Sequence, residues 1–533
     1  MAEQEAVASS SSTPRAARRG LGAISGWRAY GLAACLGAIA GLGFAPLNLV
    51  PAFALGISGL VWLAAEAPGR RSAFAVGWWW GFGHFAVNSY WIAESFLIDA
   101  ARFGWMIPPV LGGLAAYLAL YPALAALAFR MLPRPLSLAG IAGFAAAWSI
   151  AEWLRGHVLT GYPWDLAAYI WSDSDAMMQS AALWGSWGLG LVTVFVLALP
   201  ALLVRYEVRT TRQAVAGMAI ILGALYGGGQ WRLADAVPDP KVDDPGATVV
   251  RIIQPNIAQS LKISADDRPH QIDTLMRLTL ETPGFAKAKA VIWPESAANY
   301  LLEREPELRA VLAQAAPAGG MLITGAPRGE PESGKLDQIW NSLAALDDTG
   351  RILGTTDKFH LVPLGEYVPL REIFPFINKI TPGAMNFSAG PGPRTLHLPG
   401  LTSISPIICY EAIFPGAVLD PTDRPGAIVN VTNDGWFGTS TGPFQHFAAA
   451  RYRAVEEGIP LLRSANTGIS AVVDAYGRVE TRSNLEVEAV LDAAVPPALA
   501  ATPFARFGAL TLLPLLLIAL VPMLFGARKL SIS

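Results

Sequence analysis

Apolar segments long enough to cross a lipid bilayer recur along this chain and constrain its fold more than any other feature. They fall at 29–44, 49–65, 73–92, 106–129, 138–154, 181–204, 214–231 and 507–525. A helix of about 20 apolar residues spans the hydrocarbon core of a membrane. Hydrophobic residues make up 53% of the sequence and charged residues 15%, which is too apolar for an ordinary soluble protein. The pattern predicts a polytopic α-helical membrane protein with eight transmembrane helices.

The polar ends and the basic residues predict how these helices are oriented. Residues 1–28 contain a serine run and several arginines, and we expect a disordered cytoplasmic N-terminus there. Lys and Arg favour short cytoplasmic loops. Every second loop is basic, as at Arg70 and Arg71, Arg130 and Arg134, Arg205 and Arg209, and after the eighth span at Arg528 and Lys529. This distribution places both termini, including the tail 526–533, in the cytoplasm.

Residues 247–495 have globular composition and separate the first seven spans (29–231) from the eighth (507–525). The orientation puts this segment on the outer side of the inner membrane, the periplasm of a bacterium with two membranes. Apolar strand-like runs alternate in it with helical patterns at 269–282, 305–315 and 444–457. Such alternation predicts an inserted α/β domain. The net charge of −2 gives no reason to expect nucleic-acid binding.

Three residues in apolar frames could form an activated nucleophile. Cys409, one of two cysteines, follows the strand-like run of "SISPIICYE", Glu295 ends "VIWPE", and Lys358 lies in "TTDKFHLV". A thiol reacts as its thiolate and needs a base or a nearby cation. Taken singly, each residue is more often non-catalytic: Cys409 a buried small residue, Glu295 a surface carboxylate and Lys358 a solvated lysine. Their wide separation in sequence leaves their proximity to the fold.

Other polar residues of the domain are candidates for supporting roles. Glu366 in "LGEYVP" could orient Lys358 or simply form a loop salt bridge. Asn433 and Trp436 lie in a glycine-rich loop that could shape a pocket, although loop architecture alone would also explain them. Tyr410 and Glu411 directly follow Cys409.

Other motifs for a catalytic site have less support in the sequence than Cys409 with Glu295 and Lys358. The segment Gly438 to Gly442 matches a nucleophile-elbow pattern around Ser440, but only His446 follows it and no acid lies between them. A Cys409–His360 pair is chemically reasonable, yet His360 lies two positions from Lys358 and would compete with it for one strand face. The histidines are scattered without metal-ligand spacing, so no metal is expected.

The sequence resembles the nitrilase, or carbon-nitrogen hydrolase, superfamily, and within it the membrane-embedded apolipoprotein N-acyltransferase family. "VIWPES", "DKFHLVPLGEYVP" and "IICYE" carry the Glu-Lys-Cys signatures, and "GFAPLN", "EWLRGHVLTGYPWD" and "TNDGWFG" extend the similarity over about residues 30–526. One position departs, since Ile263 follows the lysine of "QSLK" where the family usually has tryptophan.

The resemblance implies an αββα sandwich and a cofactor-free, two-step acyl transfer. Cys409 would attack an ester of a phospholipid such as phosphatidylethanolamine, with Glu295 as the base and Lys358 with the Tyr410 backbone N–H stabilising the oxyanion. The acyl chain would pass to the α-amine of a diacylglyceryl apolipoprotein. Glu366, Tyr410 and Glu411 would support the site, and Phe374, Phe376 and Phe387 would form a lid against membrane lipids, unless they are a packed loop.

Two other functions are compatible with parts of the sequence. A membrane-tethered nitrilase-type amidase would use the same three residues with water as second nucleophile. A transporter with an accessory domain would require ionisable residues within its spans, whereas Glu94 and Glu152 lie near span ends. We therefore expect acyl transfer, with the amidase as the alternative.

Overall fold

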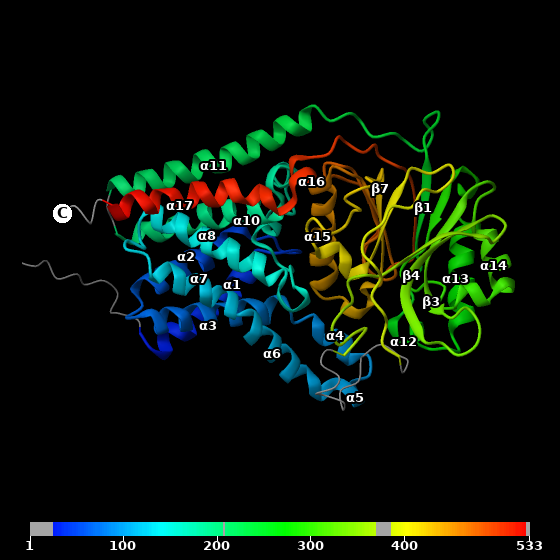
Figure 1. Cartoon of the computed structure of the whole chain (residues 1–533), viewed down its shortest axis with the longest axis horizontal. Coiled ribbons are helices and arrows are strands. Elements are labelled where there is room, and N and C mark those ends of the chain that lie inside the picture. Colours follow the sequence, from blue (N-terminus) through cyan, green and yellow to red (C-terminus); the bar gives the residue numbers. More distant parts are fainter. Residues whose placement is uncertain (1–24, 206–207, 369–384, 529–533) are drawn as a thin grey trace, which may run out of the picture.

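The computed structural model describes residues 25–205, 208–368 and 385–528. Figure 1 shows two parts side by side, a bundle of long helices and an α/β part with both sheets. The bundle contains α1 (Trp27–Gly41), α2 (Val50–Glu66), α3 (Arg70–Asn88), α4 (Ile92–Leu97), α5 (Ala100–Phe103), α6 (Ile107–Leu118), α7 (Leu120–Arg130), α8 (Leu138–Arg155), α9 (Asp175–Met178), α10 (Ala181–Ala198), α11 (Val208–Ala234), α16 (Pro503–Phe507) and α17 (Leu512–Arg528).

The apolar segments of the sequence coincide with these helices. Among the described residues, four helical stretches are long and apolar enough to cross a membrane: Ala100–Arg130, Ala181–Leu203, Val208–Ala234 and Pro503–Val521. The expected span 106–129 is divided between α6 and α7 at Ala119, because Pro122 has no N–H to donate to the carbonyl of Leu118. Membrane character is supported, while the eight crossings stay a prediction. The expected N-terminal disorder falls mostly on residues 1–24, outside the described residues.

Two sheets form the centre of the α/β part. The first has the order β11 (Ala489–Ala494), β1 (Val249–Gln254), β2 (Ala290–Ile292), β3 (Met321–Glu330), β4 (Gln338–Asp347) and β5 (Ile352–Asp357). The second has the order β10 (Val479–Arg482), β9 (Ala471–Val473), β8 (Leu461–Ala465), β7 (Ala427–Thr432) and β6 (Ile404–Ile408). The strands β1, β2 and β3 are parallel to one another, as are β6, β7 and β8.

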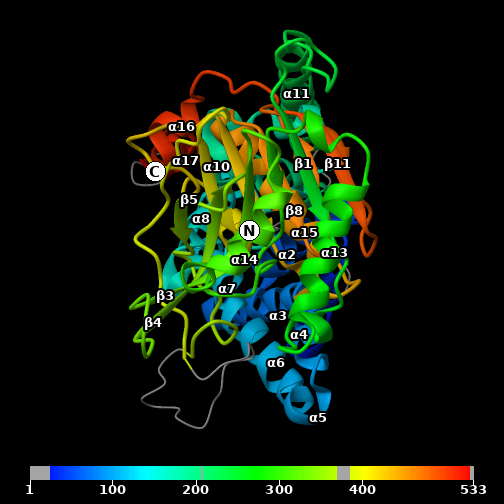
Figure 2. The ribbon, with the colours of Figure 1, turned by 90° about the vertical axis from the view of Figure 1, so that its right-hand side faces the viewer.

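Helices cover the outer faces of both sheets, giving four layers. Ile252 and Ile408 meet in a buried core between the sheets. Leu275 of α13 (Arg268–Glu281) packs with Val291 on the outer face of the first sheet, near α12 (Gln259–Lys262) and α14 (Pro306–Leu312). In Figure 2, α13 and α14 lie nearest the viewer. On the second sheet, Ala450 of α15 (Gly442–Glu457) packs with Ile428. The α/β fold expected from the sequence is confirmed, including the αββα layering.

The helix α15 also joins the α/β part to the bundle, and Figure 1 shows it between the two. Glu456 accepts hydrogen bonds from the backbone N–H and hydroxyl of Ser186 at 2.7 and 2.6 Å. Its carboxylate lies 2.9 Å from Arg453, and both side chains are fully buried. Arg453 in turn donates to the hydroxyls of Tyr169 and Ser186 in the bundle at 3.2 and 3.1 Å. Buried hydrogen bonds from both charged residues of α15 therefore join the two parts.

Candidate active site

Cys409 lies at the end of β6, where the chain turns into the 3₁₀-helix η8 (Cys409–Ile413). Its backbone has φ of 51°, in the left-handed region that non-glycine residues rarely adopt, and the side chain is 5% exposed. The carbonyl oxygen of Cys409 accepts a hydrogen bond from Nε2 of the buried His446 at 3.0 Å. This bond fixes the turn that lifts the thiol off the strand. His446 is a site residue that the sequence did not indicate as a partner of Cys409.

Glu295 and Lys358 come from the other sheet, each from a position just after a strand. Glu295 follows β2 by three residues and Lys358 directly follows β5. The Nζ of Lys358 lies 3.5 Å from Oε1 of Glu295, and the two residues are 1% and 5% exposed. The Glu411 carboxylate accepts from the backbone N–H groups of Phe359, next to Lys358, and Ile408, next to Cys409, both at 2.6 Å. The fold thus brings together the three residues singled out in the sequence.

Glu366 and Asn341 complete a buried polar network around Lys358. The Nζ of Lys358 lies 3.0 Å from the Glu366 carboxylate, which also accepts from the backbone N–H of Val362 at 2.8 Å. Asn341 on β4 donates to Glu295 at 2.7 Å and to Glu366 at 2.9 Å through one amide nitrogen. In the sequence, Asn341 stands out only as a polar residue within a largely apolar strand. Its partners Glu295 and Glu366 are 46 and 25 residues away, so the pattern could not identify them.

Burial and charge set the protonation states of this network. Burial alone lowers the pKa of Lys358, but the carboxylates of Glu366 and Glu295 outweigh it and raise that pKa above its ordinary value. Burial, followed by the negative charge of Glu295, raises the pKa of the Cys409 thiol, and Lys358 opposes this rise. The resting site therefore holds a charged lysine beside a neutral thiol. Oε2 of Glu295 has no hydrogen-bond partner among the described residues.

Glu411 connects the loop after Lys358 to the turn at Cys409. Its Oε1 accepts from the backbone N–H groups of Phe359 and His360 at 2.6 and 3.2 Å, and its Oε2 accepts from that of Ile408 at 2.6 Å. Burial raises the pKa of Glu411 to about 7, against these hydrogen bonds and Lys358. The carboxylate holds the two segments in register.

The turn at Cys409 contacts a loop of the helical bundle. The Tyr410 hydroxyl donates to the carbonyl of Gly161 at 3.2 Å, and Nε2 of His360 donates to the carbonyl of Thr160 at 2.7 Å. The His360 ring also stacks on Phe414 at 3.6 Å between centroids. His360 is thereby engaged with the bundle, which leaves the Cys409–His360 pair without support.

The residues predicted from the glycine-rich loop differ in burial and in the contacts that they make. Asn433 is buried, donates to Gln259 at 2.9 Å and accepts from Asn466 at 3.1 Å. Trp436, in η9 (Asp434–Phe437), is half-buried, and its carbonyl accepts from Ser95 in α4 at 2.8 Å. Ser440 donates to the Phe437 carbonyl at 2.6 Å, whereas His446 faces Asp434 at 2.8 Å. The nucleophile-elbow reading of Ser440 therefore gains no support.

Of the three residues predicted to form a lid, the structure describes Phe387. Phe374 and Phe376 lie outside the described residues. Phe387 is half-buried, and its backbone N–H donates to the carbonyl of Glu366 at 3.1 Å. The segment that follows the undescribed stretch is thus attached directly to the Lys358 network.

A second lysine lies near Glu295. Lys262, at the end of α12, is 3% exposed and donates to the carbonyl of Ser296 at 3.1 Å. Burial lowers the pKa of Lys262 to about 8, and Glu295 opposes this shift. Ile263, the position where the sequence departs from the family pattern, follows it and is half-buried.

One group of carboxylates could hold a cation, at a position separate from the Cys409 network. Asp239, Asp474 and Glu480 offer oxygens that lie close together. Arg478 pairs with Asp239 at 3.1 Å and with Asp474 at 2.6 Å, and Lys241 lies 3.5 Å from Glu480. Protein cations already neutralise this group.

Comparison with known proteins agrees with this architecture. The model of the apolipoprotein N-acyltransferase N-terminal domain matches residues 36–199, and the carbon-nitrogen hydrolase model matches residues 249–503. The apolipoprotein N-acyltransferase of Rhodopseudomonas palustris is 39% identical over 95% of this chain and 96% of its own length. That of Caulobacter vibrioides is 39% identical over 92% and 94%.

Among solved structures, a mutant of the amidase from Nesterenkonia sp., carrying the acetamide moiety of fluoroacetamide at its active-site cysteine, has 20% sequence identity and a TM-score of 0.35. The match covers 49% of this chain and 94% of the amidase. The full-length relatives decide the family, because their similarity extends through both the helical bundle and the α/β part. The chain belongs to the apolipoprotein N-acyltransferase family.

Proposed function

We propose that this enzyme transfers an acyl chain from a phospholipid, through a thioester on Cys409, to the α-amine of the S-diacylglyceryl cysteine of an apolipoprotein. Family membership supports the acyltransferase activity. The observation that carries the residue assignment is the buried network in which Lys358 lies 3.5 Å from Glu295, and in which Glu411 joins the segment after Lys358 to the turn at Cys409.

In the first half-reaction, Glu295 takes the proton of the Cys409 thiol as the sulfur attacks the ester carbonyl of the phospholipid. The charge that develops on the carbonyl oxygen is stabilised by the ammonium of Lys358 and the backbone N–H of Tyr410. Glu295 then returns the proton to the departing alkoxide. A lysophospholipid leaves, and the acyl chain stays on sulfur.

In the second half-reaction, the free α-amine of the apolipoprotein attacks the thioester. Glu295 accepts the amine proton, the C–S bond breaks, and the proton returns to the Cys409 sulfur. An amide and a free thiol result. Glu366, Asn341 and Glu411 hold the groups in place without touching the reacting atoms. Asn433, Trp436 and Phe387 would bound the acyl-binding space, and the lid role of Phe374 and Phe376 stays a prediction from the sequence.

The same architecture supports the proposed membrane placement. The first seven spans occupy 29–231 and the eighth 507–525, and residues 247–495 form the catalytic domain. Figure 1 shows α17 running away from the α/β part, so Arg528 at its end lies at the opposite end of the bundle. Basic residues favour the cytoplasmic side. Both termini are thus cytoplasmic, and the site faces the periplasm of a bacterial inner membrane, close to the Thr160–Gly161 loop.

The test is a reconstituted reaction with phosphatidylethanolamine and a synthetic diacylglyceryl-cysteine peptide. We expect equimolar lysophosphatidylethanolamine and N-acylated peptide, with neither product from Glu295→Gln. The exposed Glu307 provides a matched control, and Glu307→Gln should retain activity. Release of free fatty acid with no N-acylated peptide would contradict the proposal and favour a hydrolase.

A further inference from the structure

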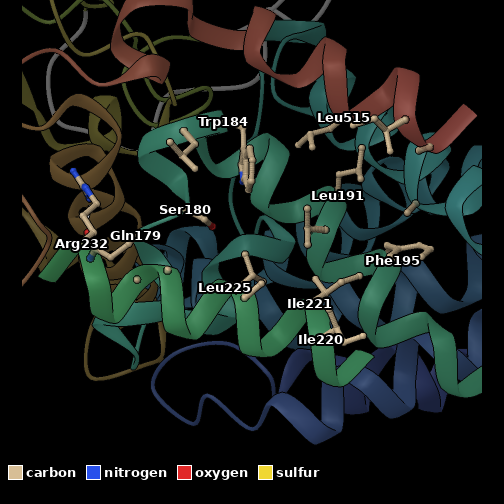
Figure 3. A pocket seen from close by; sticks show the side chains of 18 of the residues that line it. Gln179, Ser180, Trp184, Leu191, Phe195, Ile220, Ile221, Leu225, Arg232 and Leu515 are labelled. Carbon is tan, nitrogen blue, oxygen red and sulfur yellow. Dashed lines mark hydrogen bonds between the residues drawn. The ribbon is translucent and has the colours of Figure 1, made fainter. Parts of the chain in front are cut away.

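The bundle contains a large apolar cavity between α8, α10, α11 and α17. Its volume is about 920 Å³, near the upper end of the roughly 300–1,000 Å³ found for ligand pockets. Figure 3 shows Leu191, Phe195, Ile220, Ile221 and Leu515 along one part of its wall. None of the described residues that line it belongs to the Cys409 network. The cavity is therefore a second site, within helices that are apolar enough to cross a membrane.

One end of this cavity carries polar groups. Arg232 and Gln179 lie there in Figure 3, joined by a hydrogen bond from the guanidinium to the Gln179 amide oxygen. Arg232 also lies over the ring of Tyr476, 5.0 Å from its centroid. Within the described parts of the chain, no carboxylate forms an ion pair with Arg232. The exposed Asp235 also lines the cavity but forms no ion pair with Arg232, so the guanidinium can pair with an added anion.

Two further donors at the wall lack partners. The hydroxyl of Ser180 and the indole N–H of Trp184 are buried and have no hydrogen-bond acceptor among the described residues. Both residues line the cavity, and α10 departs from helical geometry at Trp184 and Gly185. Leaving a buried donor unsatisfied costs about 1–3 kcal/mol. Acceptor oxygens of a bound molecule would remove that cost.

The polar end faces the α/β part. Gln179, which lines this end, donates from its side-chain amide to the carbonyl of Tyr476 at 2.8 Å. Tyr476 belongs to the turn between β9 and β10 of the second sheet. The charged group and the hydrogen-bond donors without acceptors therefore lie toward the catalytic domain. The apolar wall extends from there into the bundle. A phospholipid in the leaflet next to the catalytic domain has the same arrangement, with its polar headgroup toward that domain and its acyl chains toward the middle of the membrane.

We propose that this cavity binds an intact glycerophospholipid as a bound lipid separate from the acyl donor at Cys409. Its phosphate pairs with Arg232, its ester carbonyls accept from Ser180 and Trp184, and its acyl chains lie along Leu191, Phe195 and Ile221. A diacylglyceryl group without phosphate would leave Arg232 unpaired. The site is thus selective for the phosphate-bearing lipid over diacylglycerol.

Two adjacent glycines supply a matched pair of variants. Gly228 and Gly227 both lie on α11, and a Cβ added at either position would meet nothing within 4 Å. Gly228 lines the cavity and Gly227 does not. Replacing either by leucine raises the helix propensity of α11 equally. Gly228→Leu fills the cavity, whereas Gly227→Leu adds an apolar side chain elsewhere on the helix surface.

The test uses full-length protein with Cys409→Ala, so that no acyl chain is held covalently, in nanodiscs with diazirine-tailed phosphatidylglycerol or diazirine-tailed diacylglycerol. We expect phosphatidylglycerol to crosslink to peptides of α10, α11 and α17. Gly228→Leu should reduce this labelling by roughly tenfold, as for loss of about 1.4 kcal/mol of binding, and Gly227→Leu should leave it unchanged. Arg232→Gln should lower it to the diacylglycerol level, while Arg212→Gln, an exposed arginine at the other end of α11, should not.

Equal labelling of the Gly228→Leu and Gly227→Leu variants would overturn the proposal, because it would indicate annular lipid contact only. Equal labelling by the two probes in the parent protein would overturn the role of Arg232. Both results are independent of whether Cys409 carries the acyl-transfer chemistry.

Discussion

The ammonium of Lys358 lies 3.0 Å from the Glu366 carboxylate and 3.5 Å from that of Glu295, so one buried cation is shared by two buried acids. Glu366 is thus the closer charged partner of Lys358, and Glu295 the more distant one. In the proposed mechanism this arrangement leaves Glu295 as the base and Lys358 as the cation near the reacting carbonyl.

Glu366→Gln removes the charge of the closer acid but retains an acceptor for Val362. We expect the turnover number to fall by roughly 100-fold, because Lys358 then loses its closer charged partner and its ammonium can move from its place toward Glu295. The exposed Glu332 offers a control, and Glu332→Gln should behave like the parent. Full activity of Glu366→Gln, measured as release of lysophosphatidylethanolamine, would reduce Glu366 to a loop residue.

Asn341→Leu removes the amide that joins Glu295 to Glu366. Hydrogen bonds to charged groups contribute about 1.5–3 kcal/mol, so we expect a loss of activity of roughly 10- to 100-fold and a lower melting temperature. Gln338→Leu, at the exposed start of the same strand, should change neither. Thermal unfolding and turnover measured on both variants check this. Unchanged turnover in Asn341→Leu would show that Glu295 needs no orienting partner.

The sequence predicted the parts of this site that depend on local chemistry. Apolar strands end just before Glu295 and Cys409, and Lys358 follows the more polar β5. These three residues were predicted to act together only through the resemblance to the nitrilase superfamily. Asn341 and His446 could not be found in that way, because their partners are 25 to 46 residues away for Asn341 and 37 for His446. The same limit applies to the attachment of α15 to the bundle.

The pH dependence of turnover should follow the protonation of Glu411. Its pKa of about 7 is raised from the ordinary value by burial, so the group loses its proton as pH rises through about 7. The ionised carboxylate accepts most strongly from Phe359, His360 and Ile408. We therefore expect turnover to fall as pH drops below about 7, and Glu411→Gln should flatten that step. A step that persists in Glu411→Gln would assign it to another group.

The thiol of Cys409 should be largely protonated at rest, because burial and then Glu295 raise its pKa. Glu295→Gln removes the negative charge that contributes to this rise. We expect iodoacetamide to alkylate Cys409 at a rate that grows with pH beyond the ordinary thiol range, and the rise should begin at lower pH in Glu295→Gln. Identical pH profiles would contradict the electrostatic coupling of the two residues.

The most direct test of the central claim is the intact mass of the enzyme after incubation with phosphatidylethanolamine and no acceptor. The account predicts an increment of one acyl group that hydroxylamine removes, that peptide mapping places on Cys409, and that Cys409→Ser does not form as a thioester. Addition of a diacylglyceryl-cysteine peptide should discharge it. A wild-type enzyme that transfers acyl chains without ever gaining this increment would contradict the account.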